Sequence, residues 1–367
     1  MGRKYSLDFR KEETGFVMGR WSADLSCSLV GVGSIGKSNL LRHLADPNVQ
    51  KHYRPTSENL FTPVVIDANA LGPIDATAND TFRCWAGYEL LMHRIYITLF
   101  PFKMIPEEDA QRFYDFYQAL QDGSNPLYGY MGLRYFELGL SLFTRNNVRF
   151  VFMLDEFEEL VHQLPVKFFQ TLRGIRDTNK ESLLFLTFSR APLSVIIDRQ
   201  GLDPLAIESF MELFTDSVCY VGPYNETDAQ KMIVEMAERY DKRITPDMST
   251  AMQKVTGRYA GLIRTTFSVM DTLNANWQLM SIETLAATLL ARYPIRMECR
   301  TIWTSLTPSE QYVLKAVAQL VPYQANEESE MTVSMLMQKR LLRLDKTQQM
   351  LEIDPPIFRA FVNTNPE

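Results

Sequence analysis

The stretch Gly31-Val-Gly-Ser-Ile-Gly36-Lys37-Ser38 matches the phosphate-binding pattern G-x-x-x-x-G-K-[ST] at every fixed position. Residues 27–30 before it indicate a short buried strand, and the leucines within residues 38–45 have helical spacing. Glycine has no Cβ atom, so such a loop can fold closely around a phosphate and turn its N–H groups inward. The following helix adds unpaired N–H donors and the positive end of its dipole. The sequence therefore predicts a phosphate cradle between a strand and a helix.

The side-chain chemistry of the residues in this phosphate loop indicates their roles. We assign Lys37 to the β- and γ-phosphates of a nucleotide and the Ser38 hydroxyl to Mg²⁺. The other residues expected to line the phosphates are Gly31, Gly33, Ser34, Ile35, Gly36 and Asn39. The expected ligands are ATP or ADP together with Mg²⁺.

A second chemical landmark is the apolar run of residues 148–154, which ends in Asp155 and Glu156. A buried strand would fix Asp155 beside the metal, and Glu156 would orient or deprotonate an attacking water. Acids at such a place are also common N-caps of the next helix. The complete phosphate loop upstream favours the catalytic interpretation, and we expect Glu158 and Glu159 to lie on a solvated helix face.

A further buried strand is predicted over residues 182–189, and Arg190 follows it. An arginine at this strand end would lie in line with the metal and the γ-phosphate and could report whether the third phosphate is present. It could equally cap the strand or pair with a surface acid. Both interpretations of Arg190 stay open at this point.

The remaining patterns predict the fold class and the domains. Strands are expected at residues 60–67 and 217–221, and helices at 81–99, 107–121, 132–144 and 166–177. From residue 226 the spacing is helical, over residues 226–240, 245–255, 259–273 and 281–291. The chain then continues with helices near 303–320 and 331–342, a short strand at 350–353 and an apolar end.

We therefore expect an α/β fold: a P-loop core with a parallel sheet, followed by an all-α lid and a C-terminal winged-helix module. The expected domains are an N-terminal strap over residues 1–26, the core over 27–222, the lid over 223–292 and the winged helix over 293–367.

Composition excludes some classes of protein. Charged residues make up 22% and hydrophobic residues 46% of the 367 residues, as in ordinary globular proteins, and the net charge of −6 argues against a surface devoted to nucleic acid. The cysteines lack metal-ligand spacing, which indicates reduced thiols in the cytoplasm. No apolar run is long enough to cross a bilayer, so we expect no membrane partner.

The order of these features resembles the AAA+/STAND group of ATPases over roughly residues 16–362: a P-loop, an acidic strand end, a strand end with arginine, a Gly-Pro hinge, a lid and a winged helix. The resemblance implies that Pro223 lies against the adenine, although here it follows Gly222 directly rather than with one residue between. It also implies that Arg264 reaches the phosphates from the lid as a second sensor, and that Thr187 or Arg190 is the first sensor.

The absence of an arginine finger distinguishes between subgroups of these ATPases. Ring-forming AAA+ enzymes carry an arginine finger before the last core strand, but residues 200–218 contain no lysine or arginine, and Arg199 is the nearest candidate. The Met-His-Asp signature of apoptotic relatives is absent as well. The resemblance is therefore to prokaryotic STAND or origin-recognition-like ATPases, which implies a nucleotide-gated switch rather than a constitutive ring.

Three functions are compatible with the sequence. The first is a slow ATPase switch that signals to a partner protein or to its own assembly. The second is a DNA-binding initiator or transposition-type regulator; Lys339, Arg340, Arg343 and Lys346 support it, whereas Glu327, Glu328 and Glu330 oppose it. The third is a scaffold that holds nucleotide without turnover, against which the intact Glu156 argues.

Overall fold

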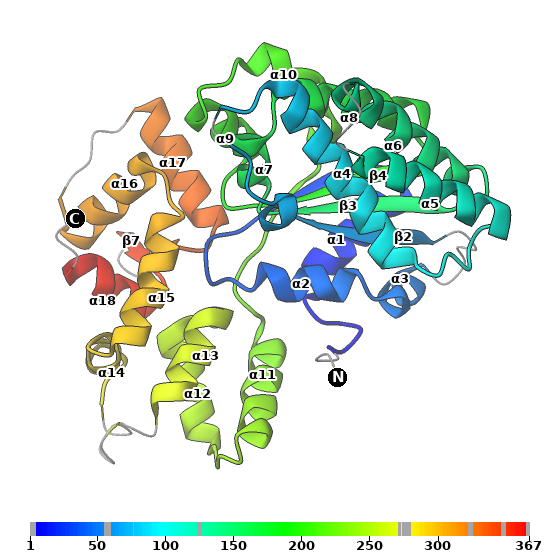
Figure 1. Ribbon diagram of the computed structural model, residues 1–367. Coiled ribbons are helices and arrows are strands. Elements are labelled where there is room, and N and C mark those ends of the chain that lie inside the picture. The colour runs from blue at the N-terminus through cyan, green and yellow to red at the C-terminus, as the bar shows by residue number, and fades with distance from the viewer. Residues whose placement is uncertain are drawn as a thin grey trace. The chain divides into compact units, whose positions relative to one another are not determined.

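A computed structural model describes residues 5–54, 60–75, 77–122, 127–270, 273, 280–321, 326–345 and 350–364 of the chain (Figure 1). The chain separates into two compact units. Unit 1 comprises Met1–Leu29 and Leu40–Cys219, and unit 2 comprises Val30–Asn39 and Tyr220–Glu367. The phosphate loop therefore groups with the C-terminal part of the chain rather than with the strand and helix that flank it.

The sheet has five strands in the order β2-β3-β4-β1-β5. Their bounds are β1 (Cys27–Val30), β2 (Phe61–Asp67), β3 (Arg149–Asp155), β4 (Leu183–Ser189) and β5 (Val218–Tyr220). Strands β2, β3 and β4 pair in parallel. The predicted α/β class with a parallel sheet is confirmed.

Continuous burial explains why these segments are strands. Every residue of β4 is buried, and in β3 only the two end residues are partly exposed. A strand covered on both faces is typical of a parallel sheet with helices on both sides. In the register of β2 and β3, Asp67 pairs with Asp155, so the two acids lie at the same end of the sheet.

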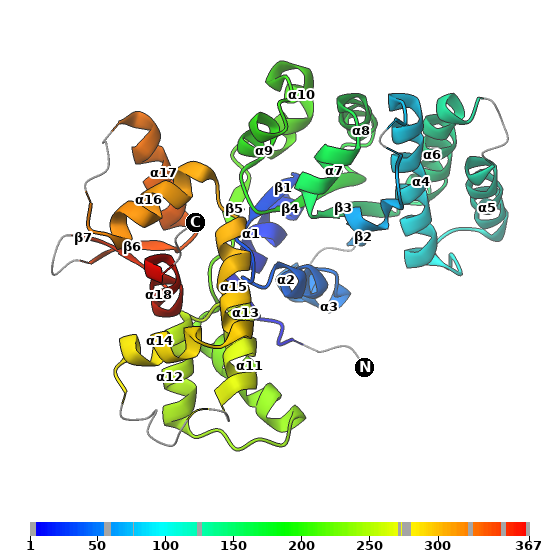
Figure 2. The same cartoon turned by 60° about the vertical axis from the view of Figure 1, so that its left-hand side comes forward.

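The helices of unit 1 follow the sequence pattern closely in its middle part. They are α1 (Lys11–Ser22), α2 (Lys37–Leu44), α3 (Pro47–Tyr53), α4 (Asp80–Leu99), α5 (Glu107–Gln121), α6 (Tyr128–Thr144), α7 (Phe157–Gln163), α8 (Val166–Thr178), α9 (Leu193–Arg199) and α10 (Pro204–Met211). Short 3-10 turns lie at Ala68–Leu71 and Glu212–Phe214. Helices α4, α5 and α6 lie together near the β2 edge of the sheet (Figure 2).

The N-terminal segment differs from the expected strap. It forms α1, whose Val17, Met18 and Trp21 are buried, so its apolar residues belong to the core of unit 1. Helix α3 was not expected either. Asp46 does interrupt the preceding helix, but its side chain then accepts a hydrogen bond from the Asn48 amide and caps a new helix at Pro47.

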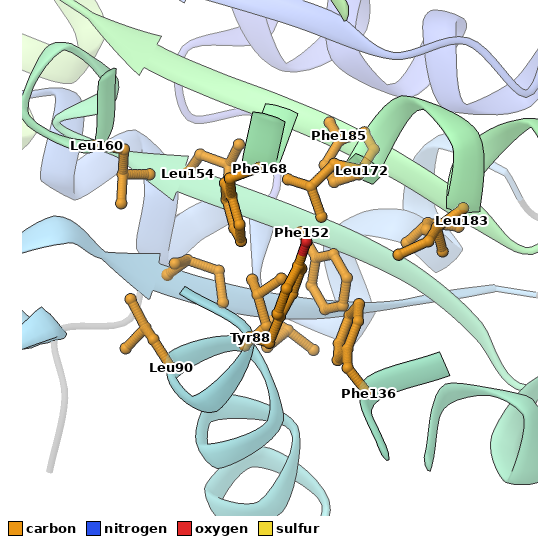
Figure 3. Packing of buried hydrophobic residues seen from close by; sticks show 14 of the residues in the cluster. Tyr88, Leu90, Phe136, Phe152, Leu154, Leu160, Phe168, Leu172, Leu183 and Phe185 are labelled. Atoms are coloured by element: carbon orange, nitrogen blue, oxygen red, sulfur yellow. The ribbon is translucent and has the colours of Figure 1, made fainter. Parts of the chain in front are cut away.

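Aromatic side chains fill the space between the sheet and helices α4, α6 and α8 (Figure 3). Tyr88 stacks on Phe136, with ring centroids 6.0 Å apart, and lies 5.3 Å from the ring of Phe168. Phe152 of β3 continues the cluster toward Phe185 of β4, at 6.1 Å. Because large aromatic side chains bury much apolar area, this cluster is the main stabilising feature of the unit.

Unit 2 is mainly helical apart from one antiparallel pair of strands (Figures 1 and 2). Its helices are α11 (Glu226–Arg239), α12 (Pro246–Thr256), α13 (Ala260–Val269), α14 (Ile282–Leu290), α15 (Tyr293–Thr304), α16 (Pro308–Ala318), α17 (Glu327–Gln338) and α18 (Pro356–Thr364). Strand β6 (Leu342–Asp345) pairs with β7 (Met350–Ile353).

The C-terminal part of unit 2 has helices followed by a strand pair, the element order that a winged helix has. Helix α16 begins with a full capping box, formed by Thr307 and Glu310. Two elements differ from expectation: α15 is a separate helix, and the apolar chain end is α18. The winged-helix assignment and the boundary at residues 292 and 293 stay predictions.

None of the helices that the structure describes combines the length and the hydrophobicity needed to cross a membrane. All four cysteines are free thiols, and Cys27, Cys84 and Cys299 are buried. Burial raises the pKa of the Cys84 thiol to about 11, so this thiol is protonated and unreactive at neutral pH.

Candidate functional site

The phosphate loop has the backbone that a phosphate cradle requires. Ser34 and Gly36 have positive φ angles of 64° and 93°, and α2 begins directly afterwards at Lys37. The Lys37 ammonium donates to the carbonyl of Gly31 and, at 3.3 Å, to that of Val32. The lysine thus curls over its own loop, at the N-terminal end of an eight-residue helix. Backbone donors, a helix start and a cation are the donor set that phosphates prefer.

Helix α15 and its C-terminal end lie against the first half of this loop. The amide of Gly33 donates to the Ser305 hydroxyl at 3.1 Å. A Cβ atom on Gly33 would lie 2.6 Å from the carbonyl oxygen of Thr301, which is far too close. Glycine at position 33 is therefore required by the close approach of α15, in addition to any role toward a phosphate.

The start of α13 lies against the middle of the same loop. The Gly261 amide donates to the Ser34 carbonyl at 2.8 Å. The Ser34 hydroxyl donates to the Glu298 carboxylate of α15 at 2.6 Å. Arg264, the expected second sensor, donates to the same carboxylate at 3.0 Å. The structure thus brings Arg264 and the loop together around an acid that the sequence reasoning did not select.

Pro223 and Tyr224 have different surroundings. Pro223, expected against the adenine, lines a cavity of about 500 Å³ within unit 2 whose charged lining includes Lys254 and Arg258. Its neighbour Tyr224 lies at the loop: its buried hydroxyl accepts a hydrogen bond from the Asn39 amide at 2.7 Å. The adenine role of Pro223 stays a prediction, and Tyr224 is an additional site residue.

Polar residues from three strand ends of unit 1 meet around Glu156, and we call this group the acidic edge: Asp67, Asn69, Asp155, Glu156 and Arg190. The Asn69 amide donates to Glu156 at 3.1 Å, and Arg190 donates to the other oxygen of Glu156 at 3.3 Å. The Asp155 carboxylate accepts from the Glu156 amide at 3.0 Å. Glu156 has a left-handed backbone, with φ 48°, a conformation that costs of order 1–3 kcal/mol and that clusters at functional sites.

The two candidates for the first sensor are placed differently. The Thr187 hydroxyl is fully buried and donates to Ser28 at 2.9 Å, inside the sheet. Arg190 is 47% exposed and reaches both Glu156 and Glu158. Of the two, Arg190 is therefore the residue that contacts the catalytic candidate. The ion pairs are partly exposed, so they are weak enough to rearrange.

The expectation for the neighbouring acids needs a correction. The carboxylate oxygens of Glu158 are buried, 3.5 Å from Arg190 at the nearest, instead of lying on a solvated face. Glu159 accepts a hydrogen bond from Gln163 at 2.6 Å on its own helix. Burial next to an arginine makes Glu158 part of the support of the acidic edge.

The sequence held a signal for Asn69 but not for the loop partners. Asp67 and Asn69 end a predicted strand, where ligands of α/β folds collect. The Asp67 carboxylate accepts the Asn69 amide at 2.9 Å, which fixes the turn. Tyr224, Glu298 and Ser305 lie within or next to helical segments with no motif, so only tertiary packing reveals them.

Comparisons with known proteins concern the fold. No protein-family model matches the chain, and no curated protein matches it. The solved structure of a Walker-type ATPase of Pyrococcus abyssi is similar with a TM-score of 0.52 and 13% identity, covering 96% of this chain and 95% of that one. The Aeropyrum pernix ORC2 protein, solved in ADPNP–ADP complexes, is similar with a TM-score of 0.50 and 10% identity, covering 96% and 93%. At these identities the likeness shows that this chain shares the overall fold of the two proteins.

Proposed function

We propose that this protein is a Mg²⁺-dependent ATPase that works as a nucleotide-operated switch of the STAND/AAA+ type. The observation that carries the proposal is the bonding of the phosphate loop to α13 and α15. A nucleotide that enters the cradle must change the contacts of Ser34 and Gly33, and both residues are tied to C-terminal helices. The phosphate state is thereby passed to the part of the chain that would meet a partner.

The roles of the residues follow from their chemistry. Lys37 and the loop amides would hold the phosphates, and the exposed Ser38 hydroxyl and Asp155 would bind Mg²⁺. Among the described residues no cluster of three or more His, Cys, Asp or Glu could hold a metal. Mg²⁺, which prefers six oxygen ligands, would therefore depend on the oxygens of the nucleotide and water.

Hydrolysis would need Glu156 to take a proton from water. In the structure Glu156 is held by Asn69 and Arg190, which each donate a hydrogen bond to one of its two carboxylate oxygens. Both oxygens that would accept the proton are therefore already engaged, which supports slow turnover. Release of Arg190 toward a terminal phosphate would free the carboxylate, and this coupling supports Arg190 as the first sensor.

The output is proposed to be a protein partner or self-association rather than DNA. Of the basic residues that supported DNA binding, Lys339 is fully buried and paired with Glu310, and Arg343 is paired with Glu352. Arg340 is exposed. Lys346 lies outside the described residues. The first turn of α17 carries Glu327, Glu328 and Glu330, which would repel phosphates.

The test is nucleotide binding by isothermal calorimetry with Mg²⁺. Lys37→Ala removes a charge-assisted contact to phosphate, so we expect ATP affinity to fall by about 10- to 100-fold, the equivalent of ~1.5–3 kcal/mol. Lys51→Ala, an exposed lysine of α3, is the matched control and should bind as the wild type does. Absence of any heat with wild-type protein and ATP would refute the proposal.

The proposed switch is tested by measuring the mass and radius of the protein with each nucleotide. Light scattering of the wild type with ADP and with a non-hydrolysable ATP analogue should give different masses or radii, because the analogue alone carries a third phosphate. A matching radius and mass in both states, with binding established, would leave an ATPase without a switch.

A further inference from the structure

The carboxylate of Glu298 lies where the phosphate loop, α13 and α15 meet. One oxygen, Oε2, accepts from the Ser34 hydroxyl at 2.6 Å, and the other, Oε1, accepts from Arg264 at 3.0 Å. Thr265 lies 3.5 Å from that second oxygen. One acid of the C-terminal part thus binds both a side chain of the phosphate loop and the arginine expected to sense phosphate.

The packing shows that this position is built for a carboxylate. A Cβ atom on Gly261 would lie 2.7 Å from Ser34 Cβ and 2.7 Å from Glu298 Oε1, so glycine at this point of α13 lets both the loop and the acid come close. The Glu298 side chain is 14% exposed, whereas Arg264 is 70% exposed. The acid is therefore held in place, while its cation remains free to leave at small cost.

In this pair, a carboxylate of the protein itself accepts the hydrogen bonds that a bound phosphate would otherwise accept. A carboxylate is an anion that accepts hydrogen bonds from hydroxyl groups and from arginine, as a phosphate oxygen does. A terminal phosphate near Ser34 would be repelled by Glu298 and would compete with it for Arg264. A diphosphate, one anionic group shorter, would experience less of this competition.

We propose that Glu298 is a specificity-determining residue that sets the preference of this protein between nucleoside diphosphate and triphosphate. It does so as an internal competitor of the terminal phosphate for Arg264 and Ser34. The inference rests on the proposed nucleotide binding and deepens it: the unliganded and diphosphate states keep the Arg264–Glu298 pair, and the triphosphate must break it.

The test compares ATP and ADP affinities of Glu298→Gln by calorimetry with Mg²⁺, without hydrolysis as the readout. Glutamine keeps the size of the side chain and a hydrogen bond to Ser34 but removes the charge. We expect the ratio of ATP to ADP affinity to rise by roughly tenfold, the scale of one partly screened charge. Glu283→Gln on α14 removes the same charge from a pair with Arg359 of α18 and should leave the ratio unchanged.

The variant Arg264→Gln distinguishes competition with the phosphate for this arginine from an ion pair that only supports the fold. If Arg264 is the shared cation, Arg264→Gln weakens ATP binding more than ADP binding. Adding Glu298→Gln to this variant should then raise the ratio of ATP to ADP affinity by less than the tenfold expected for Glu298→Gln alone. Thermal unfolding of each variant without nucleotide checks that the fold is kept.

An unchanged or lowered ATP to ADP ratio in folded Glu298→Gln would overturn the inference while leaving the proposed function intact. A wild-type protein that binds neither nucleotide would overturn the proposed function instead. The two failures are therefore distinguishable.

Discussion

The phosphate loop and the acidic edge are held by contacts of opposite kinds. The acidic edge consists of strand ends of one sheet, and Glu156 is bound by Asn69 and Arg190 of the same unit. The loop is bound instead by residues far along the chain, since Ser34 contacts Glu298 and Gly33 contacts Ser305. The sheet therefore fixes the acids that we propose for catalysis, whereas the C-terminal helices determine the surroundings of the phosphate loop.

The largest expected effect concerns the acidic edge. Glu156→Gln removes the candidate base, so we expect ATP turnover to fall by about 10²- to 10⁴-fold while ATP binding is kept. Glu159→Gln, three residues further on and bonded only within its helix to Gln163 among the described side chains, is the control. Steady-state phosphate release measures both variants. Normal turnover in Glu156→Gln would remove this glutamate from the mechanism.

The next effect tests whether the basic residues of unit 2 serve the fold or a ligand. Lys339→Met leaves the fully buried Glu310 without its cation, so we expect the free energy of unfolding to fall by about 3–5 kcal/mol. The double variant Lys339→Met with Glu310→Leu should recover most of this loss. Denaturant unfolding provides the measurement, and a stable Lys339→Met protein would contradict a structural role.

Glycine substitutions compare a crowded position with an open one. Gly33→Ala places a methyl group 2.6 Å from the backbone oxygen of Thr301, and we expect a loss of about 1–3 kcal/mol in the free energy of unfolding. Gly174→Ala in α8 meets open space and should stabilise its helix by ~0.5–1 kcal/mol. Equal effects at the two positions, measured by urea unfolding, would show that α15 does not approach the loop closely.

The last effect is a pH dependence of unit 1. His43 is buried against Phe9, and burial lowers its pKa from 6.5 to about 4. The folded state therefore favours the neutral imidazole: its contribution is fully present above about pH 6.5 and is lost as the pH falls toward 4. We expect a loss of about 3 kcal/mol across this window.

His43→Phe supplies the comparison for this pH effect. Carboxylates titrate in the lower part of the same range, so the measured quantity is the difference in unfolding free energy between wild type and variant at each pH. This difference should change between pH 6.5 and 4. A constant difference would show that His43 is not buried in its neutral form.

Much of the fold could be predicted from local patterns. The bounds of β1 and α5 agree with expectation, because apolar runs and helical spacing are strong there, and β3 is shifted by one residue from the predicted run. Prediction failed where the pattern is weak or interrupted. The apolar face of α1 follows a charged first turn and was not expected to be helical. Helix α15, with Pro294 in its first turn, was not expected as a separate helix, although proline is tolerated at that place.

The residues of the candidate site also fall into those that a local pattern indicates and those that only tertiary packing places. Lys37, Asp155 and Glu156 could be selected because each follows a local pattern whose chemistry is known. The role of Glu298 could not, because no spacing rule connects it to Ser34 across 264 positions of the chain. Thr187 shows the reverse case: a polar residue at a promising strand end is fully buried and bonded to Ser28.

The phosphate loop, the acidic strand end and the parallel sheet could be predicted from local patterns, because they depend on glycine conformations, helix starts and continuous apolar runs that neighbouring residues specify. The side chains that surround the loop could be identified only from the folded chain. The partners Tyr224, Glu298 and Ser305 are brought to it by helix packing, and packing depends on shape and burial over the whole unit rather than on any short pattern.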